Sequence, residues 1–217
     1  MADQPRPGVR PKKRARDRLI RLASLHPDYV LGFLDEVWWS RFAQPALHAW
    51  SPTDQPLRLV EQTVAQEEDS DPKALACYGL LRADREQVWL RFVDGRPVSA
   101  LTTQFLAWCL ARLAQEGKRA LLLVWDNAGW HVSKAVRAWI RAQNREVKRT
   151  GQGVRLIACY LPTKSPWLNN IEPHWIHSKR NIIEANGLLS ARELIDRICA
   201  YFGCAHEPHL SIPEQVA

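Results

Sequence analysis

The stretch "RALLLVWDNAGWHVSKAVRAWIRAQNREVKR", residues 119–149, joins two patterns that belong to different secondary structures. Residues 120–125 form an unbroken apolar run that ends in Asp126, which predicts a fully buried strand. Val132, Val136, Trp139 and Ile140 then recur on one side of a helical wheel, which predicts an amphipathic helix. A second apolar run, "VRLIACYLP" at 154–162, follows. This alternation of strand, helix and strand is typical of an α/β protein.

The segments on either side complete this picture. Strands are expected at "DYVLGFLDE" (28–36), "PLRLVEQTV" (56–64), "ALACYGLLRA" (74–83) and "QVWLRFVDG" (87–95), and residues 38–50 suggest a strand, a turn at Pro45 and another short strand. Helices are expected at 16–26, at 99–117 with Gly117 as the stop, at 169–186, and at 190–203 with Ser190 and Glu193 as a capping box. We therefore predict the α/β class, with a mixed sheet flanked by helices.

Length and composition limit the class of protein. The 217 residues, 46% of them apolar, are enough for one domain with a real core. No apolar run reaches membrane-spanning length, and the N-terminus lacks the apolar centre of a secretory signal. The five cysteines are odd in number and irregularly spaced, which favours reduced thiols. A soluble, cytoplasmic protein is expected.

Positive charge gathers in two parts of the chain. The formal net charge is +7, and residues 1–22 hold eight Lys or Arg against two Asp. Residues 126–180 hold ten Lys or Arg against three acids. A basic arm over residues 1–16, rich in Pro and expected to be disordered, together with a basic half, is typical of nucleic-acid binding. A solvated basic surface without a polyanionic partner remains the alternative.

Three acids stand at positions where a sheet protein places its chemistry. Asp35 and Asp126 each end an apolar strand, and reactions in α/β proteins collect at strand ends. Glu172 follows Pro162 and Pro166 and lies in the first turn of the next helix, after Asn169 or Asn170 as the N-cap. Each acid also has a structural interpretation. A strand-end acid can close a turn, and a first-turn acid gains about 0.3–1 kcal/mol from the helix dipole.

Three converging carboxylates would repel one another unless a cation neutralised them. Hard divalent cations bind such oxygen ligands. Two ions about 3.5–4 Å apart can hold both the attacking and the leaving oxygen of a phosphodiester. The acids together with a basic surface therefore favour metal-dependent chemistry on a nucleic acid.

Three motifs carry a family resemblance. "FLDE" (33–36), "WDNAGWH" (125–131) and "LPTKSPWLNNIEPHW" (161–175) occur in this order and resemble the catalytic core of DDE-type insertion-sequence transposases of the mariner-related superfamily. The third motif of that family commonly reads like "LPPYSPDLNPIEHVW". This chain departs from it with Lys164 for an aromatic residue, Trp167 for an acid and Asn170 for a proline.

The resemblance implies a ribonuclease-H-like fold over residues 28–205, between a basic arm with a short helix (1–27) and a tail (206–217). It implies that Asp35, Asp126 and Glu172 bind two Mg²⁺ or Mn²⁺ ions, with Glu36 as the rival to Asp35. The implied activity is hydrolysis of a DNA end followed by transfer of the freed 3′-hydroxyl into target DNA. The implied partners are transposon ends and target DNA, a second copy of the chain, and a helix-turn-helix module supplied upstream or by frameshifting.

Further residues are candidates for contact with DNA. The expected phosphate-binding side chains are Lys134, Arg137, Arg141, Arg145, Lys148 and Lys164. Asn127, His131 and Trp38 are candidate accessory residues, with Trp38 a candidate for stacking on a base and His131 either for orienting a water or for a structural hydrogen bond. Two alternatives stay open, namely an inactive remnant that still folds and binds DNA, and a ribonuclease-H-like nuclease without strand transfer.

Overall fold

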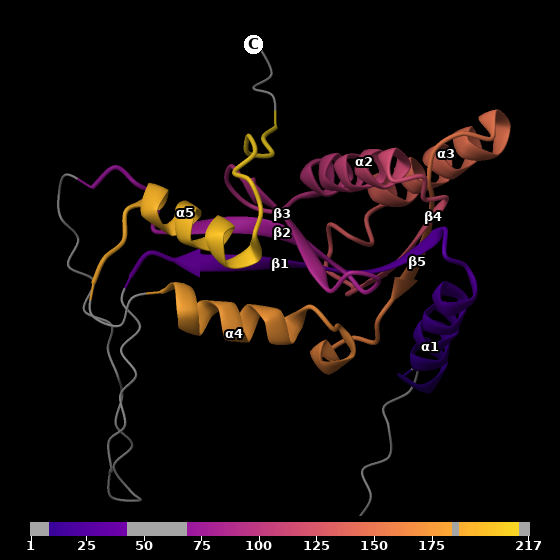
Figure 1. The fold of residues 1–217 in the computed structure, drawn as a ribbon, viewed down its shortest axis with the longest axis horizontal. Helices are drawn as coiled ribbons and strands as arrows, with labels where there is room; N and C mark the ends of the chain where they lie inside the picture. Colours follow the sequence, from indigo (N-terminus) through magenta and orange to yellow (C-terminus); the bar gives the residue numbers. More distant parts are fainter. Residues whose placement is uncertain (1–8, 43–68, 184–186, 213–217) are drawn as a thin grey trace, which may run out of the picture.

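A five-stranded mixed sheet forms the centre of the protein, seen in a computed structural model that describes residues 9–42, 69–183 and 187–212 (Figure 1). The strand order is β3-β2-β1-β4-β5. The strands are β1 (Tyr29–Ser40), β2 (Ala74–Arg82), β3 (Gln87–Val93), β4 (Ala120–Trp125) and β5 (Arg155–Tyr160). β1, β2 and β3 pair antiparallel, whereas β4 and β5 run parallel to β1 and to each other. The predicted mixed sheet is confirmed.

Helices cover both faces of this sheet. They are α1 (Val9–Leu25), α2 (Ser99–Gln115), α3 (Lys134–Thr150), α4 (Glu172–Ile182) and α5 (Ala191–Phe202), with a 3₁₀ turn, η1, at Pro166–Leu168. Side chains of α1, α4 and α5 share one core cluster with the sheet, and side chains of α2 and α3 share the other. Figure 1 shows α1 and α4 on one side of the sheet, with α2 and α3 on the other.

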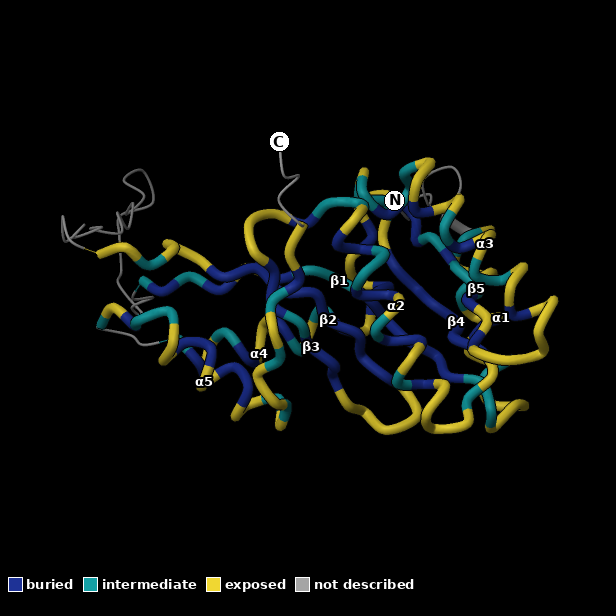
Figure 2. Tube along the Cα trace, turned by 90° about the horizontal axis from the view of Figure 1, so that it is seen from above, coloured by how far each residue is buried: buried dark blue, intermediate teal, exposed yellow. Residues whose placement is uncertain are grey.

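Alternation along β1 decides which side chain faces which layer. Phe33 and Val37 belong to the core under α4 and α5, whereas Leu34 belongs to the core under α2. Successive strand residues point to opposite faces, so Asp35 lies on the α4 side and Glu36 on the α2 and α3 side. β4 is buried along its whole length and appears as a continuous dark trace through the centre of Figure 2.

Local signals in the sequence were accurate at several helix ends. Gly117 follows α2 in a left-handed conformation with φ of 71°. Ser190 and Glu193 form the predicted capping box of α5. The N-cap prediction for α4 was wrong, because Ile171 occupies that position and neither Asn169 nor Asn170 caps the helix. The Asn169 amide instead donates to the carbonyl of Leu34, 3.0 Å away.

Two predicted boundaries also differ from the structure. Residues 9–16 are helical rather than disordered, because Lys12 and Arg16 donate to carbonyls in the segment 161–168, as described below. Residues 1–8 of the predicted arm lie outside the described residues. β1 continues to Ser40 instead of ending near Glu36, because its second half pairs with β2. The predicted strand at 56–64 and the turn at Pro45 fall outside the described residues. The domain boundaries at 27 and 205 stay predictions, and Leu210 in the predicted tail forms a bridge with Val93.

None of the helices in the described ranges combines the length and the apolar character that a membrane crossing needs.

Candidate active site

The fold brings Asp35, Asp126 and Glu172 into one region, where the middle of β1 adjoins the carboxyl end of β4 and the start of α4. β1 and β4 are parallel neighbours, and Phe33 pairs with Val124, so Asp35 lies beside the end of β4 where Asp126 follows. α4 packs against β1, and Glu172 is its first residue. The charges of Glu172 and Asp126 both act on Asp35. Residues separated by as many as 137 positions therefore share one electrostatic environment.

Asp35 is the acid most affected by its surroundings. Burial raises its pKa to about 8, with further contributions from the charges of Glu36, Glu172 and Asp126. The indole Nε1–H of Trp175 donates to Asp35 Oδ2 over 3.1 Å. Gly79 pairs with Asp35 across β1 and β2, and a Cβ at Gly79 would overlap the ring of Trp175. The glycine therefore makes the room that the indole needs beside the carboxylate.

Glu172 is half-buried, and its pKa is raised by burial and by the charge of Asp126, with Lys179 acting in the opposite direction. Two acids of the site are thus harder to ionise than usual. A cation between them would reverse this effect, because it would favour the charged form of every carboxylate.

Asp126 differs because it already has partners. Its side chain is 53% exposed, and Oδ1 accepts from the backbone N–H of Ala128 (2.9 Å) and from His131 Nδ1 (2.7 Å). Burial acts to raise the pKa of Asp126, but these two hydrogen bonds lower it below its ordinary value. Asp126 is therefore held ionised and in one orientation.

His131 forms a brace between Asp126 and Glu36. The ring is fully buried and stacks on Trp125 at a centroid distance of 4.6 Å. Its Nε2 lies 2.7 Å from Glu36 Oε1, and Trp130 Nε1 donates to the same oxygen over 3.1 Å. Burial alone would lower the pKa of His131, but the two carboxylates raise it to about 9. At neutral pH both ring nitrogens therefore donate, each to one carboxylate.

This brace separates the roles of Asp35 and Glu36, which the sequence left as rivals. Glu36 lies on the opposite face from Asp35, and its side chain is only 4% exposed. The burial of His131 fits a structural hydrogen bond rather than contact with a DNA strand. Strand alternation applied to "FLDE" was the signal in the sequence that could have separated the two acids.

A cleft of about 230 Å³ lies between Asp126 and Glu172 and is also lined by Asn127, Lys164 and Asn169. Lys164 is exposed and has a φ of 56°, an uncommon conformation for a residue other than glycine. The amide of Asn127 donates to the carbonyl of Leu161, so this side chain supports the loop after β5.

α1 is attached to loop segments beside the three acids. Lys12 Nζ donates to the Leu161 carbonyl (3.1 Å) and to Asn127 Oδ1 (3.3 Å). Arg16 donates to the carbonyl of Leu168 over 3.2 Å, at the end of η1. Two basic side chains from the N-terminal helix thereby contact the segments that precede Glu172 and follow Asp126.

The basic face of α3 is as the sequence predicted, although it lies on the other side of the sheet from α4 (Figure 1). All five of its basic candidates are exposed: Lys134, Arg137, Arg141, Arg145 and Lys148. Trp38 is exposed too, but it shares the β1 face of Glu36 rather than that of Asp35. These residues do not join the three acids in one cluster.

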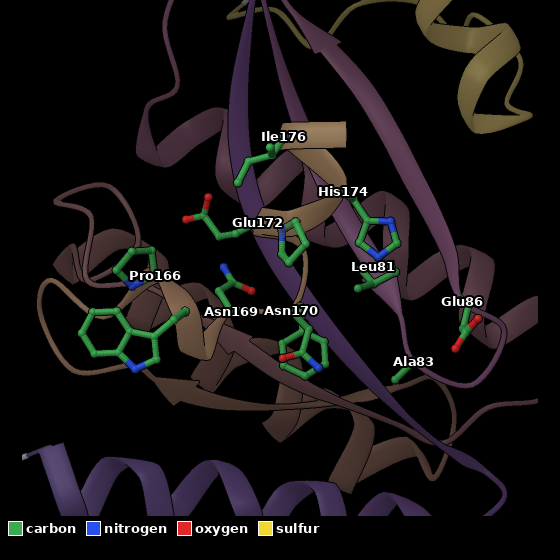
Figure 3. Close-up of a pocket in the computed structure, with 12 residues that line it drawn as sticks. Leu81, Ala83, Glu86, Pro166, Asn169, Asn170, Glu172, His174 and Ile176 are labelled. Atoms are coloured by element: carbon green, nitrogen blue, oxygen red, sulfur yellow. The ribbon is translucent and has the colours of Figure 1, made fainter. Parts of the chain in front are cut away.

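A larger hollow of about 810 Å³ opens on the other side of Glu172 and was not anticipated from the sequence (Figure 3). It lies between the start of α4, the η1 turn and the connection after β2. Trp167, which replaces an acid of the family motif, stands at its edge with 72% of its surface exposed.

The donor set at the three acids consists of carboxylate oxygens, the ligand type that Mg²⁺ and Mn²⁺ prefer. The pKa values of Asp35 and Glu172 are raised by burial and by neighbouring carboxylates, and a bound cation would offset both effects. Within residues 9–42, 69–183 and 187–212, no three His, Cys, Asp or Glu side chains are already placed as a metal site.

The strand order and the covering helices define a ribonuclease-H-like fold. A sequence profile of the DDE superfamily endonuclease family matches residues 30–195, so the chain belongs to that family. This match confirms the resemblance drawn from the three motifs. A search of curated proteins found no match.

Solved structures of a mariner transposase share the fold. The catalytic domain of Mos1 mariner transposase is 16% identical, with a TM-score of 0.54 over 94% of this chain and 84% of that one. The Mos1 strand transfer complex and the Mos1 mariner paired end complex with Mn are each 16% identical, with TM-scores of 0.60 over 94% of this chain. This chain spans 56% and 57% of those two chains.

Proposed function

We propose that this chain is the catalytic domain of a transposase that cleaves DNA ends and transfers them to a target. The observation that carries the proposal is that Asp35, Asp126 and Glu172, each from a separate family motif, lie in one region of the fold, close enough for the charge of one to raise the pKa of another. Two Mg²⁺ or Mn²⁺ ions, when bound by these carboxylates, would activate the attacking oxygen and stabilise the leaving oxygen.

The bonds that change are those of a phosphodiester. In cleavage, a water oxygen attacks phosphorus, the bond from phosphorus to the 3′-oxygen breaks, and the strand leaves with a free 3′-hydroxyl. In strand transfer, that hydroxyl attacks a target phosphorus and displaces another 3′-oxygen. Asp35 and Glu172 would hold the metal ions from the α4 side of the sheet. The brace of His131 and Glu36 holds Asp126 ionised and in one orientation.

Two basic surfaces are suited to the DNA backbone. One is the exposed face of α3, with Lys164 as a separate basic side chain at the cleft. The other is the outer face of α1, where Arg14, Arg18 and Arg21 are exposed at helical spacing. Among the described residues, no acidic side chain forms an ion pair with these three arginines. Such surfaces bind phosphates without reading sequence.

The matched Mos1 structures include complexes with transposon ends, which supports DNA as the partner here. A homodimer, an upstream helix-turn-helix module and action in the cytoplasm belong to the same proposal. Sedimentation of the chain with and without a DNA duplex would test the dimer.

Metal binding is the first test. Calorimetry with Mn²⁺ should show that Glu172→Gln, which keeps the shape and removes one charge, binds at least about tenfold more weakly than the native chain, or about 1.4 kcal/mol. Equal binding, or no binding even with DNA present, would refute the proposal and favour an inactive remnant. A second assay then offers a DNA duplex with a pre-cut 3′-hydroxyl end to a supercoiled plasmid. A transposase would join the end to the plasmid, whereas a nuclease would only nick the plasmid.

A further inference from the structure

The 810 Å³ hollow adjoins the cleft between the acids. Both cavities are lined by Pro166, Asn169 and Glu172, whereas Asp126 lines only the smaller one. A strand whose phosphate lay between Asp126 and Glu172 would therefore pass the mouth of the larger hollow. Its size is within the range of small-molecule sites in proteins, about 300–1,000 Å³.

Exposed apolar side chains gather at this hollow. Trp167 is 72% exposed and Ile176 is 53% exposed, and both line it. The turn that carries Trp167 is held by backbone hydrogen bonds, from Leu168 to Ser165 and from Asn169 to Pro166. The backbone beneath Trp167 is thus anchored while its indole faces open space.

The charge of the hollow selects against a phosphate. Glu86 and Glu172 line it, and none of its described lining residues is Lys or Arg. Asn170 and His174 add groups that can form hydrogen bonds (Figure 3). A neutral, flat ligand with polar edges suits these walls, since an aromatic side chain stacks on any base and amides or carboxylates bind base edges.

We propose that this hollow holds an unstacked nucleobase of the DNA strand bound at the acids, with Trp167 as the stacking platform. The inference rests on the proposed DNA-cleaving function and adds a base-binding subsite to it. Asn169 connects the two cavities. It is 3% exposed, and its Oδ1 has no hydrogen-bond partner among the described residues.

Binding of two short single-stranded oligonucleotides tests the subsite. One carries bases and the other is abasic throughout, so both have the same phosphates. Fluorescence anisotropy in Ca²⁺ should show that Trp167→Ala weakens binding of the base-containing strand by about 5- to 100-fold and leaves the abasic strand unchanged. Trp167→Phe should retain most of the affinity. Tyr201→Ala, which removes an exposed aromatic ring outside the hollow, is the matched control.

The outcomes separate this inference from the function on which it rests. If the native chain binds both strands and Trp167→Ala affects neither, or weakens both equally, the subsite is refuted and the DNA function is not. If the native chain binds neither strand, the DNA function fails and the subsite fails with it. Circular dichroism of each variant shows whether the protein is folded. Retention of affinity by Trp167→Phe shows that the loss in Trp167→Ala comes from the missing aromatic ring and not from unfolding.

Discussion

Replacing Asp35 with asparagine should make the metal-free protein more stable at high pH. The pKa of Asp35 is about 8 in the folded chain, against 3.8 for an unperturbed aspartate. A carboxyl group whose pKa rises on folding stabilises the folded state fully below its unfolded pKa. That stability is lost as the pH rises toward 8. Asparagine never ionises, and its oxygen can still accept from Trp175, so the variant avoids this loss.

The linkage relation sets the magnitude. Between pH 5 and pH 8 the unfolded Asp35 has released its proton and the folded Asp35 has largely kept it. Unfolding then releases one proton, and the residue lowers the free energy of unfolding by about 1.4 kcal/mol per pH unit. Over this window the stability of Asp35→Asn should gain about 3–4 kcal/mol relative to the native chain.

Urea denaturation in EDTA at several pH values measures this difference. Asp196→Asn, at an exposed position on α5, is the control and should follow the native pH dependence. Mn²⁺ at pH 8 should stabilise the native chain much more than Asp35→Asn, because the variant lacks one ligand. Native and Asp35→Asn curves that run parallel from pH 5 to pH 8 would refute both the raised pKa and the electrostatic account of the site.

The remaining predictions concern the parts around the acids. Glu36→Gln removes the charge of one of the two carboxylates that pair with the buried His131 ring, and should destabilise the protein by about 1–3 kcal/mol at neutral pH. It should also weaken Mn²⁺ binding, because His131 then orients Asp126 less firmly. Gly79→Ala should displace the indole from Asp35, which a change in tryptophan fluorescence and a lower melting temperature would report. Replacement of the α1 arginines by glutamine should reduce the salt dependence of duplex binding, with the slope of log K against log salt falling by up to about 3. The residues of that last variant are Arg14, Arg18 and Arg21.

Controls for these variants are available in the same chain. The control for the α1 variant replaces three exposed arginines at scattered positions with glutamine. This control should leave the slope of log K against log salt nearly unchanged, and a drop equal to that of the α1 variant would contradict a specific DNA-binding surface on α1. The three scattered arginines are Arg96, Arg119 and Arg192. Glu146→Gln, on the exposed side of α3, should leave Mn²⁺ binding as it is, and a Glu36→Gln chain that binds Mn²⁺ equally well would argue against the brace. An unchanged fluorescence spectrum for Gly79→Ala would argue against the contact with Trp175.

Much of the site could be predicted because its signals are local. The apolar run before Asp126, the spacing of α3 and the capping box of α5 each lie within a few turns of chain. Motif order then selected Asp35, Asp126 and Glu172 as the acids that should meet. Their proximity depends on the sheet order, which places β1 beside β4 although 79 residues lie between the two strands.

The sequence by itself determined the α/β class and most of the strands and helices of the described regions, and it named the three candidate acids, because periodicity, caps and short motifs are properties of neighbouring residues. Only the tertiary structure decided that Glu36 forms a hydrogen bond with His131, that the basic N-terminal segment is a helix attached through Lys12 and Arg16, and that Trp167 lines a hollow beside Glu172. Each of these features joins residues far apart in the chain, and such contacts form only when the sheet and its covering helices pack together.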